Sequence, residues 1–117
     1  MKNVTIYHNP RCSKSRETLA LLEQHGVQPE VVLYLDTPPS VEQLATLLQQ
    51  LGFSSARDLM RKKEDLYKTL NLAGDGLSEQ QLLQALAANP KLIERPIVVK
   101  GQQARIGRPP EQVLDIL

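Results

Sequence analysis

The residues of this sequence that could do chemistry gather around one cysteine. Cys12 is the only cysteine among 117 residues, and Ser13-Lys14-Ser15 follows it. Arg11 and Arg16 add positive charge on either side, and His8 stands four residues before the thiol. Cationic neighbours lower the pKa of a thiol, and the thiolate is the form that acts as a nucleophile. The segment therefore predicts that the sulfur attacks an electrophile that binds among positive charges, such as an oxyanion.

The elements on either side of the cysteine predict where it lies. Val4-Thr5-Ile6-Tyr7 is β-branched and aromatic, which predicts a strand. His8-Asn9-Pro10-Arg11 is expected to be a loop, because a proline biases the residue before it away from helix. From Ser13 to His25 the pattern is helical, and Gly26 ends it. Cys12 is thus expected at a helix N-terminus, where unpaired N–H groups stabilise a thiolate and bind anions.

Other roles for a lone cysteine fit the residues around Cys12 less well. Free cysteines are often small buried core residues, but the polar and cationic segment around Cys12 argues against this. The second cysteine of a C-x-x-C motif is absent, and Thr18 stands where a Cys-x5-Arg phosphatase loop needs arginine. One cysteine and the separated His8 and His25 cannot fill a zinc site. His25, beside Gly26 at a helix end, is expected to complement the helix dipole there.

The cysteine count also predicts how the reaction must finish. An internal disulfide is impossible with one cysteine, so any adduct on Cys12 must be resolved by a thiol from outside the chain. Glutathione or a glutaredoxin-type partner is the natural source of that thiol in a reducing cytosol.

The middle of the chain is predicted to be helical. Two capping boxes, Ser40 with Gln43 and Ser78 with Gln81, each predict the start of a helix. Gly52 ends the first of these helices, and a shorter helix is expected from Ala56 to Lys62. The apolar residues expected to face the core of this region are Leu44, Leu47, Leu48, Leu51, Leu82, Leu83 and Leu86.

The remaining segments are predicted to complete a sheet. Val31 to Leu35 is an apolar run typical of a buried parallel strand. Ile97 to Lys100 and Ala104 to Gly107 are expected to form a hairpin, with Gly101 at the turn. Pro109-Pro110 then begins a last helix. The predicted fold class is α/β and thioredoxin-like. Residues 1–117 form a single domain with a four-stranded mixed sheet and a helical lobe inserted at about 37–93.

Composition limits the function classes. The net charge is +1, from 14 basic and 13 acidic residues, which gives no case for binding nucleic acid or a membrane. No apolar run approaches the roughly 20 residues that cross a bilayer. Met1-Lys2-Asn3 and the residues after it contain no apolar h-region, so no signal peptide is expected. The expected location is the cytoplasm.

Three segments carry a resemblance to a known family. His8 to Arg16, Arg95 to Val99 and Arg105 to Pro109, in this order, resemble the glutaredoxin-linked arsenate reductase family, ArsC type. The likeness covers nearly the whole chain, including the Pro38-Pro39 break and the last five residues. Two features depart from typical members. Ser13-Lys14 replaces Gly-Thr after the cysteine, and the sequence stops at Leu117 where longer members continue.

The resemblance implies a role for individual residues. Cys12 would be the nucleophile, Arg61, Arg95 and Arg108 would bind the oxyanion and lower the thiol pKa, and His8 would tune the thiol. Converged arginines offer fork-shaped donors that suit a tetrahedral oxyanion. Pro96 matches a proline that is cis in thioredoxin-like folds. The residues assigned to substrate binding are Ser13, Lys14, Ser15, Arg16 and Pro96.

The resemblance also implies the reaction and its partners. Cys12 would attack arsenate, glutathione would attack the adduct, and a glutaredoxin would reduce it so that arsenite leaves. No bound cofactor or metal is expected, glutathione serves as a co-substrate, and the chain is expected to act as a monomer.

Two alternatives remain open from the sequence. Cys12-x-x-Ser15 is also the pattern of a monothiol-glutaredoxin-like thiol transferase, although a disulfide substrate needs no cup of arginines. The same family includes Spx-like regulators that bind RNA polymerase, and those with a redox switch use C-x-x-C, which this chain lacks.

Overall fold

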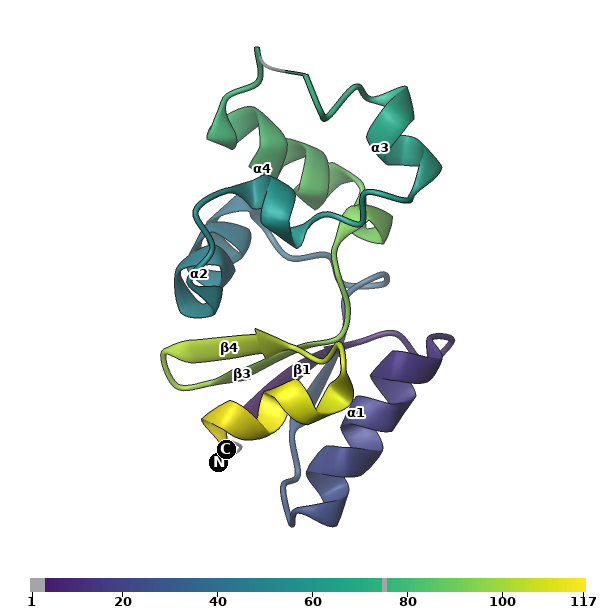
Figure 1. The fold of residues 1–117 in the computed structure, drawn as a ribbon, viewed down its shortest axis with the longest axis vertical. Coiled ribbons are helices and arrows are strands. Elements are labelled where there is room, and N and C mark those ends of the chain that lie inside the picture. Colours follow the sequence, from purple (N-terminus) through teal and green to yellow (C-terminus); the bar gives the residue numbers. More distant parts are fainter. Residues whose placement is uncertain (1–3, 75) are drawn as a thin grey trace. The chain divides into compact units, whose positions relative to one another are not determined.

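The strands form one mixed sheet with the order β2-β1-β3-β4 (Figure 1). The computed structural model describes residues 4–74 and 76–117; the first three residues, part of the segment that predicts no signal peptide, lie outside this range. β1 pairs in parallel with β2 and antiparallel with β3, and β3 pairs antiparallel with β4. The strands are β1 (Val4–His8), β2 (Glu30–Leu33), β3 (Ile97–Lys100) and β4 (Gln103–Ile106).

The chain divides into two compact units. The first unit runs to Thr37 and continues from Arg95 to Leu117, and the second is Pro38–Glu94. The first unit holds the four strands of the sheet, and the described residues of the second unit form helices, turns and an isolated β-bridge. The prediction of a single domain with a helical lobe inserted at about 37–93 stays a prediction.

The core of the first unit fixes the helix that follows Cys12. Helix α1 (Ser13–Gln24) and the 3₁₀ helix η3 (Pro110–Ile116) pack against each other, and each also contacts a strand of the sheet. One apolar cluster joins these elements, and its buried members are Val4, Ile6, Leu22, Val98, Val113 and Ile116. Because β1 and α1 share this cluster, the turn between them, which carries the cysteine, is anchored at both ends.

The second strand differs from its prediction. The sequence predicts a buried strand from Val31 to Leu35, but β2 ends at Leu33, and Val31 and Leu33 are 44% and 38% exposed. The reason is topological, because β2 lies at the edge of the sheet and has one neighbouring strand. The chain turns directly after it, where Asp36 and Thr37 donate backbone hydrogen bonds to the Leu33 carbonyl.

The two longer helices described in the second unit begin where the sequence predicts. Helices α2 (Val41–Leu51) and α4 (Glu79–Ala88) both start with a complete capping box, at Ser40 and Ser78. Gly52 ends α2 with a φ of 75°, the left-handed conformation that favours glycine. Leu44, Leu47, Leu82, Leu83 and Leu86 are buried, as predicted, whereas Leu48 and Leu51 are half-buried.

Shorter elements of the second unit depart from expectation. The helix predicted over 56–62 is the 3₁₀ helix η1 (Ala56–Leu59), and α3 (Asp65–Thr69) and η2 (Pro90–Leu92) were not predicted. Met60 is extended and forms an isolated β-bridge with Ile93, and the Arg61 N–H donates to the Leu92 carbonyl at 2.7 Å. This non-local backbone pairing ends the helix early. Within the described ranges, no helix is long and apolar enough to cross a membrane.

We predict that Leu22→Ala strongly destabilises the protein. Leu22 is fully buried in the core of the first unit, and a Leu→Ala cavity in a core costs about 2–5 kcal/mol of unfolding free energy. Leu35→Ala is the matched control, since Leu35 is 38% exposed and its truncation should cost under about 1 kcal/mol. Urea unfolding monitored by circular dichroism measures both. Equal losses would contradict this account of the core.

Candidate active site

Cys12 is the residue that caps the N-terminus of α1. Its backbone is extended, with φ −96° and ψ 124°. The Cys12 N–H donates to the Asn9 carbonyl at 3.0 Å, and its own carbonyl accepts from the Arg16 N–H at 3.0 Å. The side chain is therefore held beside the unpaired N–H groups of the first helical turn, with 9% of the residue exposed.

The surroundings of the sulfur favour the thiolate. Burial by itself raises the pKa of Cys12, because a charged sulfur loses hydration. Hydrogen bonding from the Ser15 N–H, then a hydrogen bond and the positive charge of the Arg95 side chain, and then the Lys14 N–H lower it. The lowering effects prevail, and the net pKa lies below that of an ordinary thiol. The first turn of α1 and one guanidinium thus act together on the sulfur.

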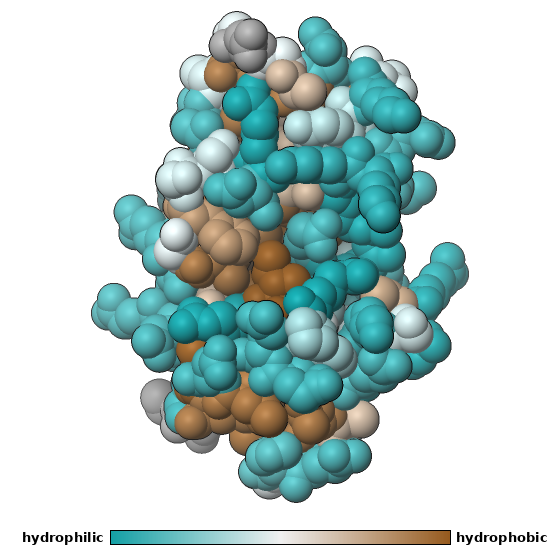
Figure 2. All heavy atoms as spheres, viewed as in Figure 1, coloured by the Kyte–Doolittle hydropathy of each residue, from teal (hydrophilic) through white to brown (hydrophobic). Residues whose placement is uncertain are grey.

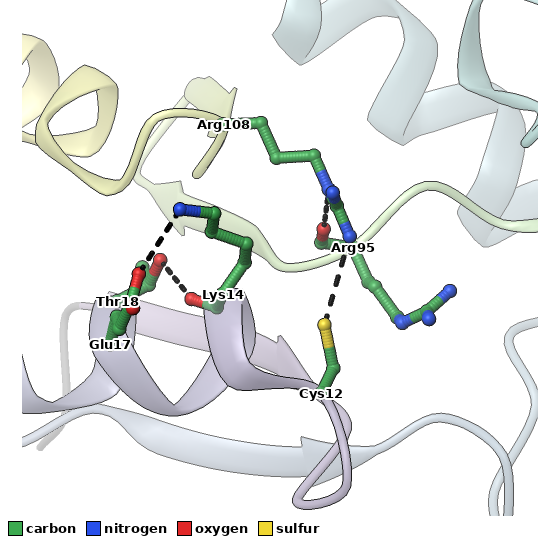
Figure 3. A network of polar contacts seen from close by, with 6 residues as sticks. All are labelled: Cys12, Lys14, Glu17, Thr18, Arg95 and Arg108. Carbon is green, nitrogen blue, oxygen red and sulfur yellow. Dashed lines mark hydrogen bonds and ion pairs between the residues drawn. The ribbon is translucent and has the colours of Figure 1, made fainter.

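Arg108 also reaches the sulfur. Its Nη2 donates to Cys12 Sγ at 3.7 Å, and its Nε donates to the Arg95 carbonyl at 2.7 Å. Figure 3 shows the guanidinium of Arg108 between these two acceptors. Arg108 thus contacts the sulfur together with Arg95, whose hydrogen bond and charge, after the Ser15 N–H, lower the pKa of Cys12. We take both arginines to favour the anion, because a cationic donor at 3.7 Å from sulfur stabilises a thiolate on the same physical grounds.

Arg95 has a donor without an acceptor. Among the described residues, its Nε is buried and has no hydrogen-bond partner. A buried donor left unpaired costs roughly 1–3 kcal/mol, so such groups are rare unless a ligand or water completes them. The charge of the same side chain already acts on the Cys12 thiol. An anionic oxygen bound beside the sulfur is a suitable acceptor for this N–H.

His8 and Ser15 form a buried pair beneath the cysteine loop. Ser15 is fully buried, and its Oγ lies 2.6 Å from His8 Nδ1 and accepts the Asn9 N–H at 2.9 Å. Burial, and then the positive charge of Arg16, lower the pKa of His8 below its ordinary value, which favours the neutral imidazole. A neutral ring can accept the Ser15 hydroxyl proton at Nδ1, which fixes the Asn9–Ser15 turn around Cys12.

The other predicted site residues of the first unit lie around this centre. Ser13 and Lys14 are exposed in the first turn of α1, and the Lys14 ammonium pairs with Glu17 at 3.5 Å. Arg16 is exposed and donates from Nη1 to the Pro10 carbonyl at 2.8 Å. Pro96 is buried directly before β3, and the Arg95–Pro96 peptide bond is cis, as the resemblance implies.

Arg61 belongs to the second unit. Its Nη1 forms an ion pair with Glu64 Oε2 at 3.2 Å, and both side chains are 28% exposed. Its predicted part in oxyanion binding stays a prediction from the resemblance. Sequence reasoning missed Glu64 as a partner, because the two residues meet across a turn in which the Glu64 N–H donates to the Arg61 carbonyl at 3.1 Å, and not along a helix.

The sequence also did not predict the close contact of Gly107 with Thr18 and Pro96. Gly107 is buried, and its Cα faces Thr18 of α1 and Pro96. A glycine between the last strand and Arg108 was a sign of close packing in the sequence. It could not show the partners, because Thr18 and Pro96 are distant from Gly107 in the sequence. In residues 4–74 and 76–117 no group of three or more His, Cys, Asp or Glu side chains could hold a metal ion.

Several known proteins are similar to this chain over nearly its whole length. The ArsC family model matches residues 7–116. An arsenate reductase of Haemophilus influenzae is 54% identical over 98% of this chain and 99% of its own. An uncharacterised Escherichia coli K12 protein, YfgD, is 67% identical over 99% of this chain and 98% of its own. The structure of an arsenate reductase from Vibrio cholerae matches with a TM-score of 0.96 and 64% identity over 97% of both chains. This likeness and the mixed sheet confirm the predicted thioredoxin-like fold class.

We predict that Arg95→Ala and Arg108→Ala each raise the Cys12 pKa. Each substitution removes a positive charge that favours the thiolate, so a smaller fraction of the thiol is ionised at neutral pH. The rate of alkylation by iodoacetamide as a function of pH measures this pKa, and its midpoint should move to higher pH in both variants. Arg11→Ala is the control, because it removes the same charge next to Cys12 in the sequence, whereas Arg95 lowers the Cys12 pKa and Arg108 contacts the sulfur. An equal shift in all three variants would mean that the effect is one of bulk charge.

Proposed function

This chain belongs to the ArsC family, and from that premise we propose that it is an oxidoreductase that reduces arsenate to arsenite through a covalent adduct on Cys12. The observation that carries the proposal is the electrostatic setting of one sulfur. Cys12 Sγ lies at the N-terminus of α1, with Arg108 Nη2 at 3.7 Å and a pKa below that of an ordinary thiol. Arsenate reductases of Haemophilus influenzae and Vibrio cholerae share most of this sequence or fold.

The first step of the proposed reaction joins sulfur to arsenic. The Cys12 thiolate attacks the arsenic atom, an S–As bond forms, and one As–O bond breaks as the oxygen takes up protons and leaves as water. The fork of Arg108 and the free Nε of Arg95 are donors for the oxygens that stay on arsenic. Donors aimed at developing negative charge supply a large share of catalysis in such sites. The resemblance adds Arg61 as a third such donor.

The second stage of the proposed reaction uses two thiols from outside the chain. Glutathione bonds to the arsenic of the adduct and releases a second oxygen as water. A glutaredoxin thiolate then attacks the glutathione sulfur and forms a mixed disulfide with it. The bond between the glutathione sulfur and arsenic breaks, its electron pair stays on arsenic, and arsenic is reduced from As(V) to As(III). Water releases arsenite and restores the Cys12 thiolate. External thiols are required because the chain has a single cysteine and cannot form its own disulfide.

The neighbours of Cys12 have supporting roles in this proposal. The neutral His8 holds Ser15, whose N–H bonds to the sulfur, so His8 tunes the thiol through the shape of the turn. We assign Ser13, Lys14 and Arg16, which are exposed in the first turn of α1, to substrate binding as donors and charges. We propose that the protein works in the cytoplasm as a monomer, with glutathione as co-substrate and no bound cofactor, and without nucleic acid or membrane partners.

We predict that arsenate turnover depends on both external thiols and on Cys12. In a coupled assay with arsenate, glutathione and glutaredoxin, NADPH oxidation through glutathione reductase reports the turnover of the wild-type protein. Cys12→Ser should abolish the activity, because an alcohol at this position is not ionised at neutral pH. Leaving out glutaredoxin should also reduce the rate.

The same assay separates arsenate reduction from thiol transfer. A mixed disulfide of glutathione replaces arsenate in parallel reactions, and Lys100→Ala, an exposed residue at the end of β3, serves as the control variant. Faster turnover of the mixed disulfide than of arsenate by the wild-type protein would contradict the proposed substrate and favour a monothiol transferase.

A further inference from the structure

Gly107 has no room for a side chain. A Cβ atom at this position would lie 2.5 Å from Thr18 Oγ1, 2.9 Å from Pro96 Cγ and 3.1 Å from Thr18 Cγ2. The first two separations are shorter than any normal van der Waals contact, so the backbone of residue 107 passes directly over the Thr18 side chain. Only a glycine hydrogen fits between the chain and these two neighbours.

Neither neighbour is free to move away. Thr18 is fully buried in α1, and its Oγ1 donates to the Lys14 carbonyl at 2.8 Å, which fixes its rotamer. Pro96 is buried, and its carbonyl accepts the Gly107 N–H at 2.9 Å. The contact at Gly107 is therefore rigid on both sides, and an added methyl group must displace the backbone of residue 107.

This contact lies where the arginines meet the cysteine helix. Arg108 directly follows Gly107, and Arg95 directly precedes Pro96. Cys12 begins the helix that carries Thr18, six residues or about 9 Å away along the axis. The Thr18–Gly107 approach thus sets how closely the segment bearing Arg108 lies to α1. The Arg108 Nε bond to the Arg95 carbonyl, at 2.7 Å, then aims the guanidinium at Cys12 Sγ.

We propose that Gly107 and Thr18 are positioning residues, whose close contact sets the separation of the Arg108 guanidinium from Cys12 Sγ and thereby the reactivity of the thiol. The proposal rests on the proposed function only in taking Cys12 as the reactive group. It assigns Gly107 a purpose beyond packing, because outward displacement of the backbone carries Arg108 with it. A hydrogen bond of 3.7 Å to sulfur has little length to spare before it is lost.

The test uses five variants that separate volume from polarity at residue 18. Gly107→Ala adds the methyl group. Thr18→Ala removes both of the Thr18 atoms that the new Cβ would meet, whereas Thr18→Val keeps the same volume without the hydroxyl. Gly107→Ala combined with Thr18→Ala, and Gly107→Ala combined with Thr18→Val, complete the set. Circular dichroism and thermal unfolding check that each folds.

The readout is the ionisation of Cys12, taken from the pH dependence of iodoacetamide alkylation in the absence of arsenate. Gly107→Ala should slow alkylation at pH 7 by about three- to tenfold and move the midpoint to higher pH, since Arg108 is displaced. Adding Thr18→Ala should recover most of the loss, because the methyl group can then shift into the space at residue 18 and away from Pro96 Cγ. Adding Thr18→Val should not, because that space stays filled. Thr18→Ala and Thr18→Val alone should stay near the wild-type rate.

Several outcomes would overturn the proposal. One is a wild-type alkylation profile in folded Gly107→Ala, and another is equal recovery with Thr18→Ala and Thr18→Val. If Gly107→Ala does not fold alone, the double variant with Thr18→Ala should fold and keep the alkylation rate of Thr18→Ala. Failure of that double variant to fold would count against the proposal, because space freed at residue 18 should admit the methyl. Arsenate turnover is measured separately, so a protein that does not reduce arsenate can still support or overturn this inference.

Discussion

A thiolate sheltered from water must be surrounded by positive charge and hydrogen-bond donors, and this requirement organises the first unit of the protein. Burial alone raises the pKa of Cys12 and so favours the protonated thiol. The opposing groups come from two sources that are distant in sequence, namely the backbone of the first turn of α1 and two arginines near the end of the chain. Neither source is useful unless the fold holds them together, so the sheet and the α1–η3 packing serve this one interaction.

The hairpin of β3 and β4 explains how the arginines come together. Ile97 pairs with Ile106, so the residues just outside this pair, at the open end of the hairpin, must also be neighbours. The Gly107 N–H bonds to the Pro96 carbonyl, and Arg108 bonds to the Arg95 carbonyl. Antiparallel pairing therefore makes neighbours of Arg95 and Arg108, which are 13 residues apart in the sequence. Because β1 lies next to β3 in the sheet, the turn that carries Cys12 lies beside these two arginines.

Features governed by local chemistry were predictable from the sequence. Both capping boxes and the left-handed Gly52 depend on residues within one turn, and they form as predicted. Features governed by distant partners were not. Nothing local shows that β2 lies at the edge of the sheet, or that pairing of Met60 with Ile93 ends a helix. The sequence resemblance named Arg95 and Arg108, but the Thr18–Gly107 contact depends on the distance between two backbones and has no signature in either segment.

The exposed strand β2 has a consequence for how the protein behaves in a crowded solution. An edge strand offers unpaired peptide groups to any other extended chain, and apolar side chains such as Val31 and Leu33 make such pairing more favourable. Here the strand is four residues long, begins with the charged Glu30, and runs directly into a turn. Shortness, a carboxylate and an abrupt bend are the means by which natural sheets avoid acting as templates for aggregation, so the edge is protected without an additional element to cover it.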